Sequence, residues 1–527
     1  MRKKDYILLF FLALTIYTLV ATLQKEPGYM DSEYYFNQAI RIVHGDGLME
    51  PFIWNYLGNP KGLPVPGFAF WMPLTSFISA LSLWIFQSTD FYVARIPFVI
   101  LAAALSPMSA FLATQFINTK RVGWLAGGLT IVAGYYLPFL TITDNFLPYM
   151  FLGAAILIIL SQVQKAQTAN RAAWLSGLTG IVVGLMAYTR SEGLGWILPA
   201  GFAIMISRLD KDGKKTRGFL NLAWLSIGFV ITFAPWLVRN IHIYNALFPP
   251  ANSSMLWLTN YEDLFVYPSS VLSSARFLDS GFQIIFKDRL QALGSNLQTM
   301  IASGGSIFLI PLIVIGWWKY RKNLLSKSVG IALLLIVFIM SFIFPFAGER
   351  GGFFHSLSSI QIFLWAMVPV GLEVVIDWGI NRRGWKRNRS WIMFGTGIIA
   401  ASICLTAYIF VDKLENGLEI NVPWNESSSL FTQIESILEQ QGANENDVIM
   451  INDPPGYTLY TGRSSVMIPT GEMASIHEAI DQFDVRYLAI TDDRNDVKRM
   501  FSVDSNLLKD FSLLYEEDDL MIYEYLE

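Results

Sequence analysis

The sequence predicts an α-helical polytopic membrane protein that ends in a small α/β domain. Hydrophobic residues make up 53% of the 527 residues and charged residues only 15%, whereas soluble domains carry about 25% charged residues. Apolar blocks of span length follow one another as far as residue 411, and from Asp412 the composition is that of a soluble protein. We therefore expect a transmembrane domain over 1–411 and an extracytoplasmic α/β domain over 412–527.

Composition also excludes several classes of function. The net charge of −4 gives no basis for a nucleic-acid partner. The single cysteine, Cys404, excludes a disulfide framework or a cysteine-based metal site. The sequence has neither a phosphate-binding GxxxxGK[ST] loop nor a strand-borne GxGxxG, so we expect no nucleotide cofactor.

The first apolar block, 6–23, follows Arg2, Lys3 and Lys4. It is long for a signal peptide and no Ala-x-Ala cleavage site comes after it, so we interpret it as an uncleaved first span. The basic residues before it place the N-terminus in the cytoplasm.

Twelve apolar blocks are close to the length of a span, and the distribution of basic residues tests how many of them cross. If all twelve cross, the later basic loops fall outside; if one early block does not cross, all of them fall inside. The block to exclude is 66–87, which contains Pro73, follows "PKGLPVPG" and is rich in Trp and Phe, the residues of membrane interfaces. We therefore expect about eleven spans, 66–87 at the outer face, and an extracytoplasmic C-terminus. The remaining blocks are 6–23, 91–117, 122–141, 146–164, 172–188, 193–207, 218–238, 302–318, 328–346, 356–378 and 391–411.

This topology places five clusters of ionisable residues on the face opposite the basic loops. Ionisable residues at membrane level are costly and tend to mark function, although each cluster alone is equally well explained as an anchor at the end of a span. The clusters are Asp31 with Glu33; Asp144; Arg190 with Glu192; Arg239; and Glu349, Arg350 and His355.

Asp31 and Glu33 open a segment with apolar residues at helical spacing, which Gly45 and Gly47 end. We expect a helix that lies on the membrane with one side in lipid. Two residues apart, the acids face different directions. Asp31 is a candidate general base for a hydroxyl acceptor, a candidate ligand of a cation such as Mg²⁺ or Mn²⁺ together with Asp144, or a simple helix cap.

Arginines at the same depth suit a phosphate group. Arg190 and Arg239 can each bind a phosphate through two nitrogens. An acid for the acceptor and a guanidinium for the leaving phosphate are what an enzyme acting on a lipid-linked phosphate needs.

The tail alternates helix and strand patterns. "SSSLFTQIESILEQQG" and "EMASIHEAIDQF" are typical of helices, "DVIMIN" and "VRYLAIT" of buried strands, and "FSLLYEEDDLMIYEYL" of a hairpin. We interpret "NDPPGYTLYTGRSSVMIP" as a structural turn, although a contact with an acceptor stays open.

Several segments together resemble the GT-C glycosyltransferases, in particular bacterial members of the protein O-mannosyltransferase and lipid A aminoarabinose transferase group. "YMDSEYYFNQAIRIVHGDGL" is similar to the first outer loop of that family, "ITDNFLPYMFL" to its second acidic loop, and "LPVPGFAFWMPL" stands where the family has a His-Pro-Pro-Leu-Tyr-like segment. "GLMAYTRSEGLGWILP" and "APWLVRNIHIYNALFPP" are similar to further recurrent segments. The likeness covers roughly 5–260 well and is weaker as far as 411.

The resemblance implies a sugar donor carried on a polyprenyl phosphate, transfer with inversion, and catalytic roles for Asp31 and Asp144. Arg190 and Arg239 would bind the donor phosphate, and Glu33, Glu192, Glu349, Arg350 and His355 are secondary candidates. Two departures weaken any inference about the acceptor, which we leave open among protein, lipid and polysaccharide: Ser32 stands where the family has a second acid, and the His-Pro-Pro segment lacks its His. We expect the protein in the plasma membrane of a bacterial cell.

Two other functions remain to be weighed. A transporter of lipid-linked sugars would place its charges near the middle of the membrane, often within an internal repeat, whereas here they lie at one face. A non-catalytic partner subunit on the same scaffold also stays open, because Ser32 departs from the family pattern.

Overall fold

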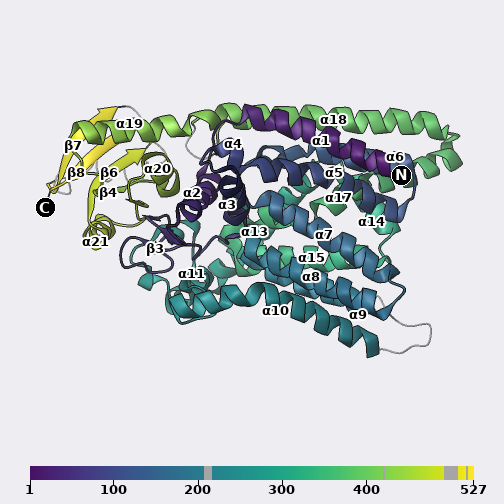
Figure 1. The fold of residues 1–527 in the computed structure, drawn as a ribbon, viewed down its shortest axis with the longest axis horizontal. Helices are drawn as coiled ribbons and strands as arrows, with labels where there is room; N and C mark the ends of the chain where they lie inside the picture. Colours follow the sequence, from purple (N-terminus) through teal and green to yellow (C-terminus); the bar gives the residue numbers. More distant parts are fainter. Residues whose placement is uncertain (207–215, 419–421, 492–508, 518–519, 527) are drawn as a thin grey trace.

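Long apolar helices run side by side through most of the molecule (Figure 1). The computed structural model describes residues 1–206, 216–418, 422–491, 509–517 and 520–526. Within these ranges eight helices are long and apolar enough to cross a membrane, which an α-helix can do because it satisfies its own backbone hydrogen bonds. They are α1 (Lys3–Leu23), α4 with α5 (Phe91–Ala94, Ile96–Phe116), α7 (Phe146–Lys165), α8 (Ala169–Thr189), α10 (Thr216–Tyr244), α15 with η7 (Leu324–Phe338, Ile339–Ile343), α16, η8 and α17 (Pro345–Ala347, Gly348–Gly352, Phe353–Arg383), and α18 (Arg387–Asn416).

Three further predicted spans correspond to shorter helices. The number of eleven crossings therefore stays a prediction, while the helical membrane architecture is confirmed. These helices are α6 with η1 (Lys120–Val132, Gly134–Phe139), η2 with α9 (Ser191–Trp196, Ile197–Ile206), and η6 with α14 (Met300–Gly304, Ile310–Lys319), the last pair preceded by α13 (Phe282–Thr299).

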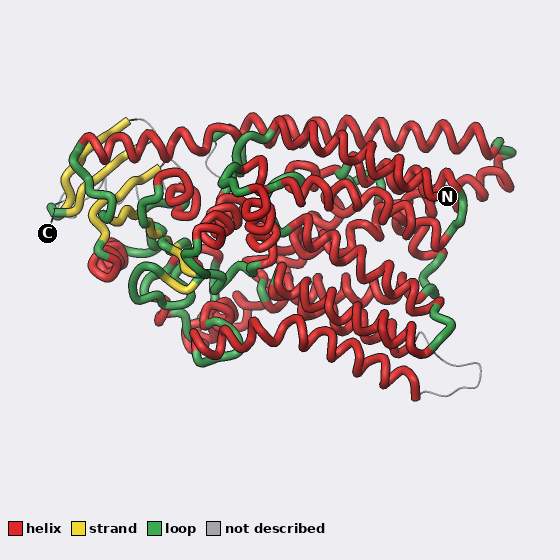
Figure 2. Tube along the Cα trace, viewed as in Figure 1, coloured by secondary structure: helices red, strands yellow, loops and turns green. Residues whose placement is uncertain are grey.

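The block 66–87 forms only α3 (Leu74–Phe86), a helix of 13 residues. At about 1.5 Å per residue it spans roughly 20 Å, less than the ~30 Å hydrocarbon layer. It packs against α2 (Met30–His44), and both helices lie where the bundle meets the α/β domain (Figures 1 and 2). This arrangement agrees with a position at the outer face.

Small residues allow the long helices to approach closely. A Cβ atom on Gly153 of α7 would lie 1.9 Å from the backbone oxygen of Ser359 in α17, and one on Gly180 of α8 would lie 1.9 Å from that of Leu225 in α10. Glycine is thus required at both crossings, as is common where membrane helices pack without a strong hydrophobic driving force.

Basic loops meet at the end of the bundle that holds the N-terminus. Lys120 pairs with the buried Asp5 at 2.8 Å, and Arg121 and Arg387 share Glu373 at 2.7 and 2.9 Å. The α/β domain lies at the opposite end (Figure 1). The basic residues predicted between 208 and 215 lie outside the described residues.

The tail forms the expected helices and strands. The two predicted helices, the two buried strands and the hairpin are all present, although the hairpin turn at 518–519 is outside the described residues. "NDPPGYTLYTG" is a helix rather than a turn, because prolines are tolerated in a first turn and the Asp453 side chain accepts a hydrogen bond from the Gly456 N–H. The elements are η9 (Trp424–Glu426), α19 (Ser427–Gln440), β4 (Val448–Met450), α20 (Pro454–Thr461), β5 (Ser465–Val466), α21 (Met473–Phe483), β6 (Val485–Thr491), β7 (Phe511–Glu517) and β8 (Leu520–Tyr525).

The six-stranded sheet of this domain includes a strand from the first outer loop. Its order is β2-β5-β4-β6-β8-β7, where β2 (Phe52–Ile53) pairs in parallel with β5, and Phe52 lies opposite Ser465. The α/β domain is thus joined to the loop that follows α2. The rest of the outer end consists of β1 (Met49–Glu50), β3 (Val65–Pro66), α11 (Pro250–Ser254), η3 (Met255–Trp257), η4 (Tyr261–Phe265), η5 (Ser269–Val271) and α12 (Ser274–Asp279).

Trp424 anchors the start of the α/β domain on the bundle. Its side chain is fully buried, its indole N–H donates to the Glu26 carbonyl at 3.0 Å, and its ring contacts Tyr29 edge-on. A Cβ on Gly28 would lie 2.3 Å from the indole, so the chain passes directly beneath the ring.

We expect Trp424→Ala to destabilise the folded protein by about 3–5 kcal/mol, since it leaves a large cavity and an unpaired carbonyl. Scanning fluorimetry in detergent should show a clear fall in melting temperature. Trp84→Ala, which removes an indole that is 62% exposed, serves as control and should change it little. Equal shifts in the two variants would contradict the anchoring role.

Candidate functional site

Asp31, Asp144 and His355 come together at the end of the bundle that carries the α/β domain (Figure 1), although they are far apart in sequence. Asp31 lies in the first turn of α2, Asp144 directly before α7, and His355 in the first turn of α17. One ligand atom from each lies within 4.8 Å of the others, and His355 Nε2 is 3.8 Å from Asp31 Oδ2. We call these three residues the acid–histidine cluster.

Asp144 is held by its own loop and by the residue before α2. The Tyr29 hydroxyl donates to Asp144 Oδ2, and the Asn145 N–H donates to Oδ1. The Thr143 hydroxyl donates to the Ser32 carbonyl at 2.9 Å, which joins this loop to α2. The side chain of Asp144 is fully buried, so its position is fixed from several sides.

His355 is oriented by Asn145. Its Nδ1 lies 2.7 Å from Asn145 Oδ1, while Asn145 Nδ2 donates to the Tyr35 hydroxyl at 3.1 Å. With the amide assigned in this way its oxygen can only accept, so Nδ1 carries the proton and Nε2 offers a lone pair to the cluster. The ring stacks on Phe146 with centroids 3.7 Å apart. Orientation of a histidine through its second nitrogen is typical of metal ligands.

Burial raises the pKa of both carboxyl groups. The pKa of Asp31 rises to about 7, mainly through loss of solvation, with an opposing effect of Arg190 and a further rise from Asp453. The pKa of Asp144 also rises to about 7 through loss of solvation, opposed by hydrogen bonding from the Asn145 backbone and by Arg190. Two carboxyl groups and an imidazole lone pair form a donor set that fits a divalent cation, whose charge would offset the cost of ionising both acids.

A cavity of about 490 Å³ lies beside the cluster, and we call it the reaction cavity. Asp31 and His355 line it together with two guanidinium groups. Arg190 forms an ion pair with Glu192, and Arg350 lies over the ring of Tyr261, 4.8 Å from its centroid. Glu192 also accepts a hydrogen bond from the Ser356 hydroxyl at 2.7 Å.

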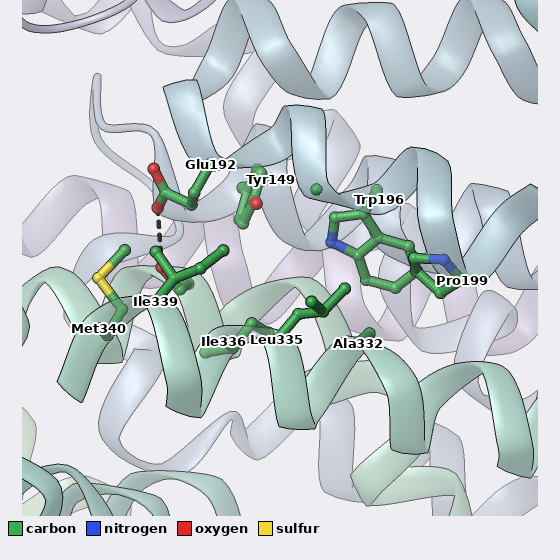
Figure 3. A pocket seen from close by; sticks show the side chains of 11 residues that line it. Tyr149, Glu192, Trp196, Pro199, Ala332, Leu335, Ile336, Ile339 and Met340 are labelled. Carbon is green, nitrogen blue, oxygen red and sulfur yellow. Dashed lines mark hydrogen bonds between the residues drawn. The ribbon is translucent and has the colours of Figure 1, made fainter. Parts of the chain in front are cut away.

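A narrow apolar groove continues from the reaction cavity between η2–α9 and α15. Glu192 lies at one end, where the dashed bond to Ser356 is drawn, and Trp196, Pro199 and Ala332 lie toward the other (Figure 3). The groove and the cavity share Glu192, Gly195, Ile339 and Met340.

Other candidates lie apart from the cluster. Glu33 is fully buried toward α20, where a Cβ on Gly456 would lie 2.6 Å from its carboxylate. Glu349 accepts a hydrogen bond from the Ser295 hydroxyl at 3.1 Å. The first turn of α2 is capped by neither Asp31 nor Ser32, since the N-cap is Tyr29 without a side-chain cap.

The structure separates Arg239 from Arg190. Arg239 donates to the Gly67 carbonyl at 2.6 Å, stacks over Trp236 and is not among the residues that line the reaction cavity. The two arginines therefore do not face one phosphate.

The expectation that α2 rests with one side in lipid also needs correction. Its residues from Ser32 to Ala39 are all buried, because α3 and α20 pack against the helix.

Sequence reasoning missed the residues that orient the cluster. Tyr29, Tyr35 and Asn145 each lie next to or near a predicted acid, in "GYMDSEYYF" and "TITDNF". Their proximity in sequence was the available signal, but only the fold shows that Asn145 bridges Tyr35 and His355.

Comparison with known proteins identifies the fold. No family model and no curated protein sequence matches the chain. Among solved structures, ArnT from Cupriavidus metallidurans bound to undecaprenyl phosphate superposes with a TM-score of 0.58 at 10% identity, over 99% of this chain and 98% of that chain. The oligosaccharyltransferase of Archaeoglobus fulgidus in the apo form has a TM-score of 0.56 at 12% identity, over 97% of this chain and 73% of that chain.

Other structures of the archaeal enzyme match as well. One is a complex with Zn and sulfate, which has a TM-score of 0.53 at 12% identity and covers 98% of this chain and 73% of that chain. Another holds an inhibitory peptide and a dolichol-phosphate; its TM-score is 0.52 at 11% identity, over 92% of this chain and 69% of that chain. Both neighbours belong to the GT-C superfamily, and the chain has the GT-C fold.

We expect the acid–histidine cluster to bind Mn²⁺, and Asp31→Asn or Asp144→Asn to abolish that binding by removing a charged ligand. Asn145→Leu, which leaves His355 without its hydrogen-bond partner, should weaken binding about 10–100-fold. Electron paramagnetic resonance of free Mn²⁺ measures the affinity. Glu349→Gln is the control, and binding that survives Asp144→Asn would rule out this site.

The affinity for Mn²⁺ should also increase as the pH is raised from below 7 to above 7. Below that value the raised pKa values of Asp31 and Asp144 keep both carboxyl groups protonated, and a cation must displace those protons. The same titration repeated between pH 5.5 and 8.5 checks this expectation. An affinity that stays constant over this range would show that these carboxyl groups do not bind the ion.

Proposed function

We propose that the protein is a membrane glycosyltransferase that moves a sugar from a polyprenyl-phosphate donor to an acceptor at the outer face of the membrane. The observation that carries the proposal is a single cavity lined by Asp31, His355, Arg190 and Arg350, which opens into an apolar groove. An acid, a cation site and guanidinium groups beside an apolar groove are what transfer from a lipid phosphate needs.

The donor lipid would lie in the groove between η2–α9 and α15, with its phosphate between Arg190 and Arg350. Glu192 holds Arg190 in place, and no ion pair with a carboxylate engages Arg350 among the described residues. Guanidinium groups bind phosphate oxygens in pairs. The neighbours support this class of donor, since ArnT is bound to undecaprenyl phosphate and the archaeal enzyme to a dolichol-phosphate.

Asp31 would act as general base. It accepts the proton of an acceptor hydroxyl or amine while the acceptor oxygen or nitrogen forms a bond to the anomeric carbon. The bond between that carbon and the phosphate oxygen breaks, and the electron pair leaves with the lipid phosphate. One such displacement inverts the anomeric centre. An ionised carboxylate at this position can accept that proton at neutral pH.

Asp31, Asp144 and His355 are the residues that would hold a Mg²⁺ or Mn²⁺ ion. When bound, the ion would supply positive charge that stabilises the negative charge developing on the leaving phosphate. Arg190 and Arg350 contribute to the same end, because preorganised charges in a site that excludes water act strongly on the transition state.

The orientation follows from the charge distribution. We place the N-terminus in the cytoplasm and the α/β domain outside a bacterial plasma membrane, since the basic loops gather at the N-terminal end. An acceptor of protein, lipid or polysaccharide would then approach from the extracytoplasmic side.

We expect Asp31→Asn to lower transfer by about 10²–10⁴-fold, since it removes the base. The assay compares envelope glycans and glycoproteins by mass spectrometry in cells that express the wild type, Asp31→Asn or Glu349→Gln, with protein levels matched. The Glu349 variant should keep its activity. Full activity of Asp31→Asn would overturn the catalytic role, and identical glycans with and without the wild type would overturn the function.

A further inference from the structure

A second cavity of about 400 Å³ lies next to the reaction cavity, and we call it the loop cavity. It is formed mainly by the segment 50–70, with Tyr244 and Ala251 at its side. Its volume falls within the ~300–1,000 Å³ that is common for ligand sites. The two cavities share Trp54 and Phe70, so these two side chains form the wall between them.

A buried carboxylate lines this cavity. Glu50 is only 5% exposed, and the hydrogen bonds that it accepts from the Tyr34 hydroxyl and, at 2.9 Å, from the Phe68 N–H both end on Oε1. Within the described part of the chain, Oε2 accepts no hydrogen bond. This oxygen can accept a hydrogen bond from a ligand in the cavity, which Glu50 lines.

Burial raises the pKa of Glu50 to about 7, and hydrogen bonds from Tyr34 and Phe68 and the charges of two arginines oppose this rise. Arg239 and Arg41 act on it electrostatically, and Arg239 is fixed nearby by its bond to the Gly67 carbonyl. A cationic ligand is therefore not required, and an anionic one would meet the carboxylate. The remaining need is for a neutral ligand that donates hydrogen bonds.

Aromatic side chains form part of the cavity wall. Phe52, Trp54, Phe70 and Tyr244 line it, and Trp54 is held by stacking on Trp71 at a centroid distance of 4.0 Å. Flat rings offer apolar faces to the C–H side of a sugar ring, while Glu50, Asn55 and the Tyr244 hydroxyl can bind its hydroxyl groups.

The apolar groove and the loop cavity meet the reaction cavity at different residues. The apolar groove meets the reaction cavity at Glu192 and Ile339, whereas the loop cavity meets it at Trp54 and Phe70; the groove and the loop cavity share no lining residue among those described. A donor whose lipid occupies the groove leaves the opposite side for the acceptor.

We propose that the loop cavity binds a neutral sugar unit of a glycan acceptor and presents its hydroxyl group to the reaction cavity past Trp54 and Phe70. The assignment as acceptor site rests on the proposed function, whereas binding of a neutral sugar can be tested without it.

The test measures saturation-transfer NMR from the purified full-length protein to methyl α-D-mannopyranoside and methyl β-D-glucopyranoside. Gly58 and Gly62 line the cavity and have no atom within 4 Å of an added Cβ, so Gly58→Phe and Gly62→Trp would fill it, while Gly58→Ala is the matched control. Glu50→Gln removes the charged acceptor. Glucose 6-phosphate and a Ser/Thr-rich peptide are the competing probes.

We expect at least one glycoside to bind the wild type and Gly58→Ala, and both large variants to lose that signal. Glu50→Gln should weaken binding roughly tenfold, as expected for one hydrogen bond to a charged group. Absence of glycoside binding, equal binding in the large variants, or preferred binding of the phosphate or peptide probe would each overturn the proposal.

A second measurement separates this proposal from the function. Undecaprenyl phosphate binding, followed by native mass spectrometry, should persist in Gly58→Phe and Gly62→Trp, which also shows that they are folded, and should fall in Arg190→Gln. If the wild type fails to bind this lipid but still binds the glycoside, the donor assignment is wrong and the sugar site is retained.

Discussion

Two carboxyl groups, the buried Asp144 and the partly buried Asp31, impose the main constraint on the end of the molecule that carries the α/β domain. Loss of solvation disfavours their charged forms and raises both pKa values to about 7. The charge of Arg190 opposes this rise at both groups, and hydrogen bonding from the Asn145 backbone opposes it at Asp144. The surrounding helices and loops hold these two costly groups beside His355, and ionisable groups in such positions tend to mark function.

Much of this architecture is encoded locally and could be predicted. Apolar blocks, the unequal distribution of Lys and Arg, and the alternating patterns of the tail each depend on neighbouring residues, so the membrane helices and most elements of the α/β domain were expected. The placement of Asp31 near Asp144 at one end of the bundle followed from the same reasoning. Local patterns could not fix the number of crossings, because several helices are short or broken.

Contacts between distant segments were beyond sequence reasoning. His355 was one of three secondary candidates in its cluster, and its role depends on Asn145, which lies 210 residues away. Arg239 was grouped with Arg190 because both follow apolar blocks, yet its guanidinium is engaged by the Gly67 carbonyl. Glu50 was not among the candidates from the sequence, because an isolated glutamate in a loop gives no sign that folding buries it.

The pairing of β2 with β5 has a consequence for how the protein is made. The segment that follows α2 leaves the ribosome early, but its strand partner at Ser465–Val466 and the covering helix α20 are synthesised more than 400 residues later. Trp424, which packs on Tyr29 beside Asp144, also belongs to this late part. The packing that supports the site from the side of the α/β domain thus stays incomplete until the chain is nearly finished, so truncated products would enter the membrane without this support.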